Sequence, residues 1–264
     1  AIHGRDNALV LASHARGMWV LDQINALQEL TPAILTKPSH LFTMQPAHQV
    51  RMANLRPHAG DMVFRGENPA NGAYVDYWLA QSGASATLTV LDASGVVVQE
   101  LKPTTSRGIN RIVWNLRYAD IPLRGGGGED DEGPSRSSTD GPLVLPGTYT
   151  VRLVAGGVTS SQQVVVREDP RVTVSVVDRR AWTTFQRQVA ELATTFAPTA
   201  DRARRATARD PQTSELKRQA GELLSRISTL YGATARWTGR PTADQRTQLA
   251  YYQKMANTLG AASF

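Results

Sequence analysis

Four adjacent carboxylates are the residues of this sequence whose type points most directly to a chemical role: Glu129, Asp130, Asp131 and Glu132. Carboxylate oxygens are ligands that calcium prefers, so these residues are calcium candidates. They follow four consecutive glycines and do not alternate with small residues, as the ligands of an EF-hand loop do. A flexible insertion over residues 124–142 is therefore the favoured interpretation, because glycine-rich polar segments resist ordering.

The other residue types that commonly perform catalysis show no recognisable constellation. The histidines are His3, His14, His40, His48 and His58, and no two have the spacing of metal ligands on one helix face. The sequence contains no nucleophile elbow, phosphate-binding glycine loop or dinucleotide fingerprint. Its lack of cysteine excludes disulfides, thiolate metal sites and thiol catalysis. We therefore expect no catalytic residue, no cofactor and, apart from the calcium candidates, no metal site.

Two aromatic residues, Tyr74 and Trp78, lie in a strand-like segment over residues 74–81. At an exposed sheet edge their rings could stack on a sugar or contact a partner. Their position in a strand favours the alternative, in which both side chains belong to a core.

The first strands of the chain have the composition of a sheet that is covered on both sides. Two apolar runs are separated by the residues HARG, whose Gly17 suits the turn of a hairpin. The strand residues are Leu9, Val10, Leu11, Trp19, Val20 and Leu21. We expect that no earlier residue supplies neighbours for this hairpin, so these six residues form a candidate strand-addition segment.

The first two zones of the chain predict extended and β structure. Residues 1–57 contain the hairpin and then an extended connector, because Pro32, Pro38 and Pro46 oppose a long helix. Residues 58–172 contain about seven short strands with turn signals, and they predict an Ig-like β-sandwich interrupted by the insertion.

The last zone, residues 176–262, changes to the spacing of a helix. Apolar residues recur there at intervals of three and four, which predicts a small three-helix antiparallel bundle. Asp178 and Thr242 are the expected N-caps, and Pro211 suits the first turn of the second helix. The predicted fold class is therefore mainly β plus α.

Charge and hydropathy limit the classes of partner. The net charge is +6, from 29 basic and 23 acidic residues. The densest basic stretch, residues 201–209, has no aromatic residue for base stacking, so we expect a solvated helix face and no nucleic-acid partner. No apolar run approaches the roughly 20 residues of a membrane span, and the start of the chain lacks a signal-peptide pattern.

Several motifs together resemble one family. LVLASHARGMWVLDQI, from Leu9, resembles the final blade of bacterial β-propellers of the BNR-repeat, sortilin-like family, which are often labelled glycosyl-hydrolase-like. GENPANGAYVDYWL, VLDASGVVVQEL, GINRIVWNLRY and PGTYTVRLVAGG are similar to the Ig-like domain that follows that propeller, which is akin to flagellar-hook-capping domains. RPTADQRTQLAYYQ is similar to the C-terminal helices of the family.

The resemblance implies a role without catalysis. The chain would be an accessory or scaffold region of an exported, periplasmic or extracellular propeller protein, bracing the propeller and contacting protein or glycan. Its first partner would be the rest of the propeller, either missing from this chain or supplied by another. One alternative is a sialidase-like propeller glycoside hydrolase whose active site lies outside these residues. Another is a subunit of an envelope assembly that binds its partner through the N-terminal strand.

Overall fold

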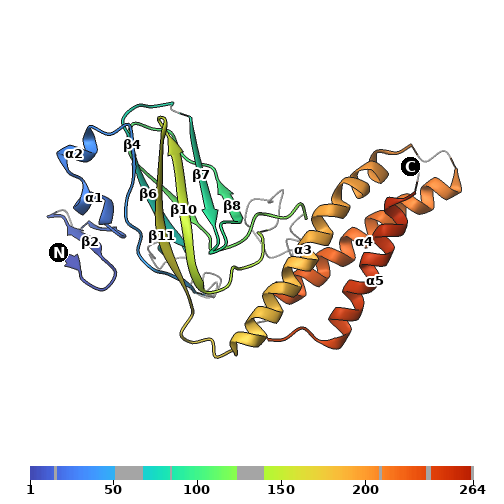
Figure 1. The fold of residues 1–264 in the computed structure, drawn as a ribbon. Helices are drawn as coiled ribbons and strands as arrows, with labels where there is room; N and C mark the ends of the chain where they lie inside the picture. The colour runs from blue at the N-terminus through green and yellow to red at the C-terminus, as the bar shows by residue number, and fades with distance from the viewer. Residues whose placement is uncertain are drawn as a thin grey trace. The chain divides into compact units, whose positions relative to one another are not determined.

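The computed structural model describes residues 1–14, 17–50, 68–83, 85–123, 140–207, 210–235 and 239–262. Together they form five helices and three β-sheets, one of which is curled into a half-barrel (Figure 1). This mixed content confirms the expectation of β structure followed by helices. The chain divides into two compact units, Ala1–Leu116 with Pro146–Val172 and Arg117–Leu145 with Thr173–Phe264.

The two larger sheets of the first unit contain the strands predicted within residues 58–172, together with two short strands from the first zone of the chain. A five-stranded sheet has the order β5-β11-β10-β7-β8, and a three-stranded sheet has the order β4-β6-β9. The strands of the first are β5 (Ala47–Gln49), β7 (Ala86–Leu91), β8 (Val97–Leu101), β10 (Gly147–Ala155) and β11 (Val158–Glu168). Those of the second are β4 (Ser39–Leu41), β6 (Ala73–Leu79) and β9 (Gly108–Trp114).

Two hairpin turns connect strands of the five-stranded sheet, and each has a local cause. Gly156 and Gly157 join β10 to β11 with φ of +58° and +75°, the left-handed values that favour glycine. Asp92 organises the turn from β7 to β8, because its carboxylate accepts hydrogen bonds from the backbone N–H groups of Ser94 and Val96.

The core of the first unit involves side chains of both larger sheets. Trp114 of β9 and Tyr149 of β10 meet edge to face, with their ring centroids 5.2 Å apart. Ser39 of β4 donates a hydrogen bond of 2.8 Å to the carbonyl of Ala155 in β10. One face of β6, which includes Val75, is fully buried.

The expected extended connector contains more regular structure than the sequence indicated. Two short helices, α1 (Asn25–Glu29) and α2 (Pro32–Leu35), precede β4. β4 pairs with β6, and β5 pairs in parallel with β11. The prolines do prevent a long helix. The segments β4 and β5 nevertheless form strands, because they pair with strands that lie far away in the sequence.

The second unit is built on three long helices, α3 (Val176–Arg205), α4 (Pro211–Ala235) and α5 (Ala243–Gly260). Pro211 opens α4, as predicted. Thr242 caps α5 in a capping box with Gln245, also as predicted. The expected cap of α3 is wrong: Ser175 is the N-cap and accepts from the N–H of Asp178, which lies inside the first turn.

The predicted apolar stripes of these helices form one core cluster. It includes Phe185, Val189, Leu223, Ile227, Leu249 and Leu259. Ile121 and Leu123 join the same cluster, although the sequence analysis placed them in the β zone. A buried link between helices reinforces it, because the Trp182 indole N–H donates to the carbonyl of Thr234 over 2.8 Å. The segment Arg117–Leu145 therefore belongs to the helical unit.

Candidate functional site

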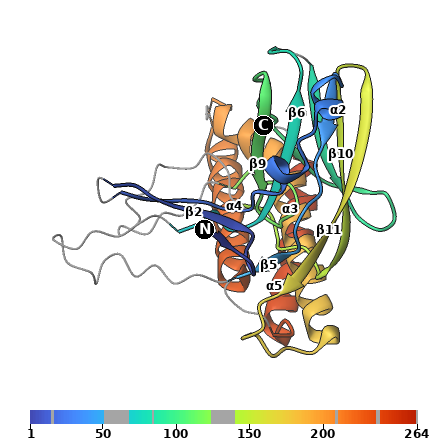
Figure 2. The same cartoon turned by 90° about the vertical axis from the view of Figure 1, so that its left-hand side faces the viewer.

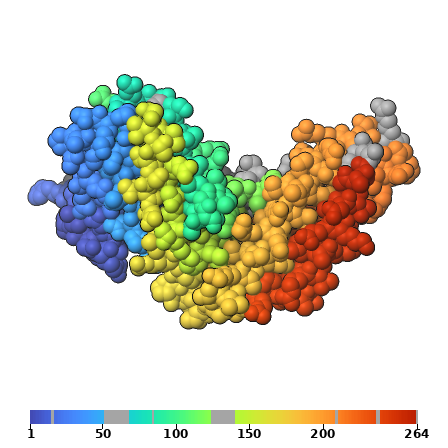
Figure 3. Space-filling model, in the orientation of Figure 1, coloured from blue at the N-terminus to red at the C-terminus, as the bar shows by residue number. Residues whose placement is uncertain are grey.

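The N-terminal sheet of the first unit, which we call the ribbon, exposes six large apolar side chains. The ribbon consists of β1 (Ile2–His3), β2 (Ala8–Ala12) and β3 (Met18–Leu21). Its side chains Met18 and Trp19 are 73% and 70% exposed. Figure 2 shows the ribbon extending away from the two larger sheets, and Figure 3 shows its dark blue atoms at the surface. Exposed apolar side chains gathered on one sheet are common at interaction sites, so the ribbon is the candidate functional site.

Both faces of the ribbon are apolar. Residues directly opposite each other in antiparallel strands point to the same face, and the strand pairs assign each side chain. Face one carries Ile2, Leu9, Leu11, Trp19 and Leu21. Face two carries Ala8, Val10, Ala12, Met18 and Val20, with the polar residue His3 opposite Ala8 at the start of the sheet. A sheet with one solvated face would instead alternate apolar and polar residues.

All six predicted strand-addition residues lie in the ribbon, in two strands that pair with each other. Leu9, Val10 and Leu11 pair with Leu21, Val20 and Trp19, respectively. Ile2 and Met18, which were not predicted as site residues, add exposed apolar surface to the two faces. The expectation that no earlier residue pairs with the hairpin is wrong, because β1 pairs with β2.

A charged latch holds the end of the ribbon against the outer face of the sheet β4-β6-β9. The Arg111 guanidinium makes two hydrogen bonds to the Asp76 carboxylate, of 2.6 and 2.7 Å. It also donates to the carbonyls of Asp22 and Gln23, each over 2.6 Å, just after β3. The Asp76 and Arg111 side chains are only 6% and 28% exposed, so water competes weakly for these bonds.

The surroundings of the latch favour its charged state. The hydrogen bond to Asp76 is the largest cause that raises the pKa of Arg111. The guanidinium also lies over the ring of Tyr74, 4.9 Å from its centroid. Arg111 therefore ties two strands of the sheet to the chain that leaves the ribbon.

A second polar cluster fixes the other side of the ribbon base. The carboxamide of Asn7 bonds to Asn25 and exchanges hydrogen bonds with Gln28 of α1. The N–H of Ile24 donates to the Asn7 carbonyl over 2.9 Å. Asn7 and Gln23 both have left-handed φ, +48° and +49°, which costs little for Asn but strains Gln. The ribbon is thus anchored at its base, while its apolar faces remain in solvent.

With this geometry established, comparisons with known proteins add no family. No protein-family model matches the chain, and no curated protein sequence matches it.

The two predicted aromatic contact residues, Tyr74 and Trp78, lie on the face of β6 that carries Asp76. Trp78 packs against the apolar cluster of Ala26, Ile34 and Phe42, and its indole N–H donates to the Lys37 carbonyl. Both side chains are half-buried.

Tyr74 also lines a groove of about 800 Å³ beside the ribbon base. Gln23, Asn71, His48 and Arg167 line the same groove. Burial is the largest cause that raises the pKa of Tyr74. The predicted sugar or partner contact at Tyr74 stays a prediction.

The calcium candidates Glu129, Asp130, Asp131 and Glu132 lie outside the described residues. Within the described ranges, no three His, Asp or Glu side chains gather as metal ligands would. No helix in the described part of the chain combines the length and the apolarity that crossing a bilayer requires.

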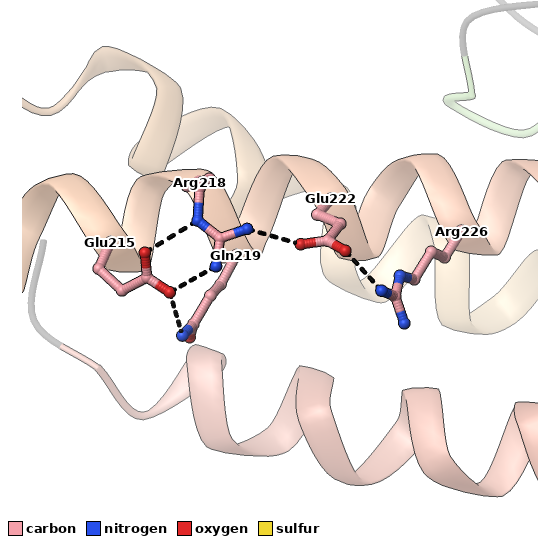
Figure 4. Close-up of polar contacts among 5 residues, drawn as sticks. All are labelled: Glu215, Arg218, Gln219, Glu222 and Arg226. Atoms are coloured by element: carbon pink, nitrogen blue, oxygen red, sulfur yellow. Dashed lines mark hydrogen bonds and ion pairs between the residues drawn. The ribbon is translucent and has the colours of Figure 1, made fainter.

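Alternating charges form a ladder of ion pairs along α4 of the helical unit (Figure 4). Glu215 accepts from Arg218 over 2.6 Å, Arg218 donates to Glu222 over 3.0 Å, and Glu222 pairs with Arg226. These pairs lower the pKa of Glu215 to about 2 and also lower the pKa of Glu222. The ladder satisfies its charges along one helix, as expected of a solvated face.

Proposed function

We propose that this chain is a non-catalytic accessory region of an exported β-propeller protein. In this proposal the ribbon forms part of a propeller blade, and the remaining strands lie in polypeptide outside residues 1–264. The observation that carries the proposal is that both faces of the ribbon are apolar and exposed.

A propeller blade supplies the environment that such a sheet needs. Each blade packs on both faces against neighbouring blades, so its strands lack a solvated face. Burying one large apolar side chain is worth about 2 kcal/mol, and exposing several on each face forfeits that stabilisation. An isolated ribbon of this size is also marginal in water. Neighbouring blades would remove both costs.

The rest of the chain has the character of a brace. The two larger sheets, with their ring contact between Trp114 and Tyr149, support the proposed Ig-like β-sandwich. The common core of α3, α4 and α5 supports the proposed three-helix bundle. The Arg111 latch connects the ribbon to the sheet β4-β6-β9 of the proposed sandwich. The ribbon is therefore attached to a well-packed part of the chain.

The test compares paired substitutions on the two faces in two settings. Leu11→Ser with Trp19→Ser alters face one, and Met18→Ser with Val20→Ser alters face two. In residues 1–264 alone we expect either pair to leave the Tm nearly unchanged, because these side chains are already exposed. In the natural gene product isolated from its source cells, each pair should lower the Tm by several degrees, because buried apolar contacts are lost.

The matched control is Leu27→Ser with Leu35→Ser, which alters exposed leucines of α1 and α2 outside the ribbon. We expect this pair to have no effect in either setting. An unchanged Tm of the natural gene product after substitution of either ribbon face would contradict the proposal.

A further inference from the structure

We infer that the ribbon joins the propeller by strand addition at the outer edge of β3, through the backbone groups of Met18 and Val20. This inference rests on the proposed function and specifies the contact. The partner that fits is an extended strand of about four residues from a sheet outside residues 1–264.

The hydrogen bonds within the ribbon determine which backbone groups face outward. The N–H of Ser13 donates to the Gly17 carbonyl over 2.8 Å. Because bonded and non-bonded pairs alternate along an antiparallel ladder, Leu11 with Trp19 forms the next bonded pair.

The alternation places Val10 opposite Val20, and Ala12 opposite Met18, in non-bonded pairs. Val10 confirms this assignment, because its N–H and carbonyl bond to Ala1 on the β1 side, over 2.8 and 2.9 Å. Met18 and Val20 therefore direct two N–H groups and two carbonyls toward the outer edge of β3. No described strand other than β2 pairs with β3.

The sequence of β3 gives this edge no protection against pairing. Natural edge strands are commonly guarded by charges, prolines or bulges. The edge strand β8 of the five-stranded sheet follows this rule, since it contains Glu100. Residues 18–21, MWVL, contain no such residue and expose four apolar side chains. The edge is thus suited to pairing.

The two apolar faces of the ribbon indicate which kind of strand pairs with the outer edge of β3. A second copy of this chain, paired edge to edge, would satisfy the outward groups but leave both faces of the joined sheet in water. A strand that belongs to a stack of several sheets can pair with the outward N–H and carbonyl groups of β3. The neighbouring sheets of that stack would then cover both apolar faces of the ribbon. We therefore assign the edge to the propeller and not to self-association.

Residue-resolved amide exchange tests this assignment in the natural gene product and in residues 1–264 alone. Strand addition predicts that the amides of Met18 and Val20 exchange at least about 100-fold more slowly in the natural gene product. The amides of Trp19 and Leu21 bond within the ribbon and serve as internal references. Fast exchange at Met18 and Val20 in the natural gene product would overturn the inference. If both amides exchange slowly in residues 1–264 alone, and their protection increases with protein concentration, the edge pairs with a second copy of the chain. That result would also overturn the inference.

Two substitutions separate this inference from the proposed function. Val20→Pro removes an outward N–H, a change that edge strands tolerate, so residues 1–264 should keep their wild-type Tm. In the natural gene product it should return Met18 to fast exchange, whereas Val20→Thr keeps the N–H and should preserve slow exchange. Slow exchange at Met18 despite Val20→Pro would overturn strand addition alone. If the paired serine substitutions on the ribbon faces leave the Tm of the natural gene product unchanged, the proposed function is instead overturned.

Discussion

At the residue scale, Arg111 links the end of the ribbon to the sheet β4-β6-β9. One guanidinium satisfies the Asp76 carboxylate and the carbonyls of Asp22 and Gln23. A lysine could not reproduce this arrangement, because its ammonium lacks the planar fork of donors. Arg111 therefore fixes the direction in which the chain leaves the ribbon, together with the cluster around Asn7.

Replacing Arg111 with methionine should leave the Asp76 carboxylate buried without its partner. We expect the free energy of unfolding of the first unit to fall by about 3 kcal/mol, the usual cost of breaking a buried ion pair from one side. Urea unfolding measures the change, and Arg152→Met, at an exposed position of β10, is the matched control. Equal unfolding midpoints for the two variants would refute the role given to the latch.

At the scale of elements, the strands and helices with a clear local pattern could be predicted from the sequence, whereas those that depend on distant contacts could not. The strands β6 to β11 and the helices α3 to α5 follow from alternation, turn residues and helical spacing, which act over a few residues. β4 and β5 were missed because strands of three residues carry little periodic signal and depend on pairing with β6 and β11.

The charge ladder of α4 is an element-scale feature with a measurable pH dependence. The folded state lowers the pKa of Glu215 from 4.5 to about 2, so its stabilising effect is complete above about pH 4.5. That effect should be lost as the pH falls through about 2, when the carboxylate becomes protonated in the folded state too.

Glu215→Gln should therefore lower the Tm at pH 6 and make less difference at pH 2. Thermal unfolding followed by circular dichroism at both pH values measures this, and high salt should reduce the difference at pH 6. An equal effect of the substitution at pH 6 and pH 2 would mean that the ion pairs do not stabilise α4.

At the scale of the whole molecule, the sequence predicted a β zone followed by a helical zone. It did not predict that the segment Arg117–Leu145 belongs to the same unit as the helices. Ile121 and Leu123 precede the strand β10, yet their side chains belong to the core of the helices. Only the packed structure reveals this, because an isolated apolar residue in a loop has no period.

The candidate site shows the same contrast between local and distant signals. The six ribbon residues were predicted from two short apolar runs. The Asp76–Arg111 pair and the pairing of β1 were not, since each depends on residues brought together by the fold. The exposure of both ribbon faces also required the structure, and the functional proposal depends on it.

Side-chain oxidation by hydroxyl radicals tests this central claim most directly, because Met18 and Trp19 both oxidise readily and lie on opposite faces of the ribbon. Both should oxidise rapidly in residues 1–264 alone and slowly in the natural gene product, while exposed Tyr251 reacts in both and buried Trp182 in neither. Protection of Met18 and Trp19 together is the result we predict. Rapid oxidation of either one in the natural gene product would contradict burial of the ribbon within a propeller.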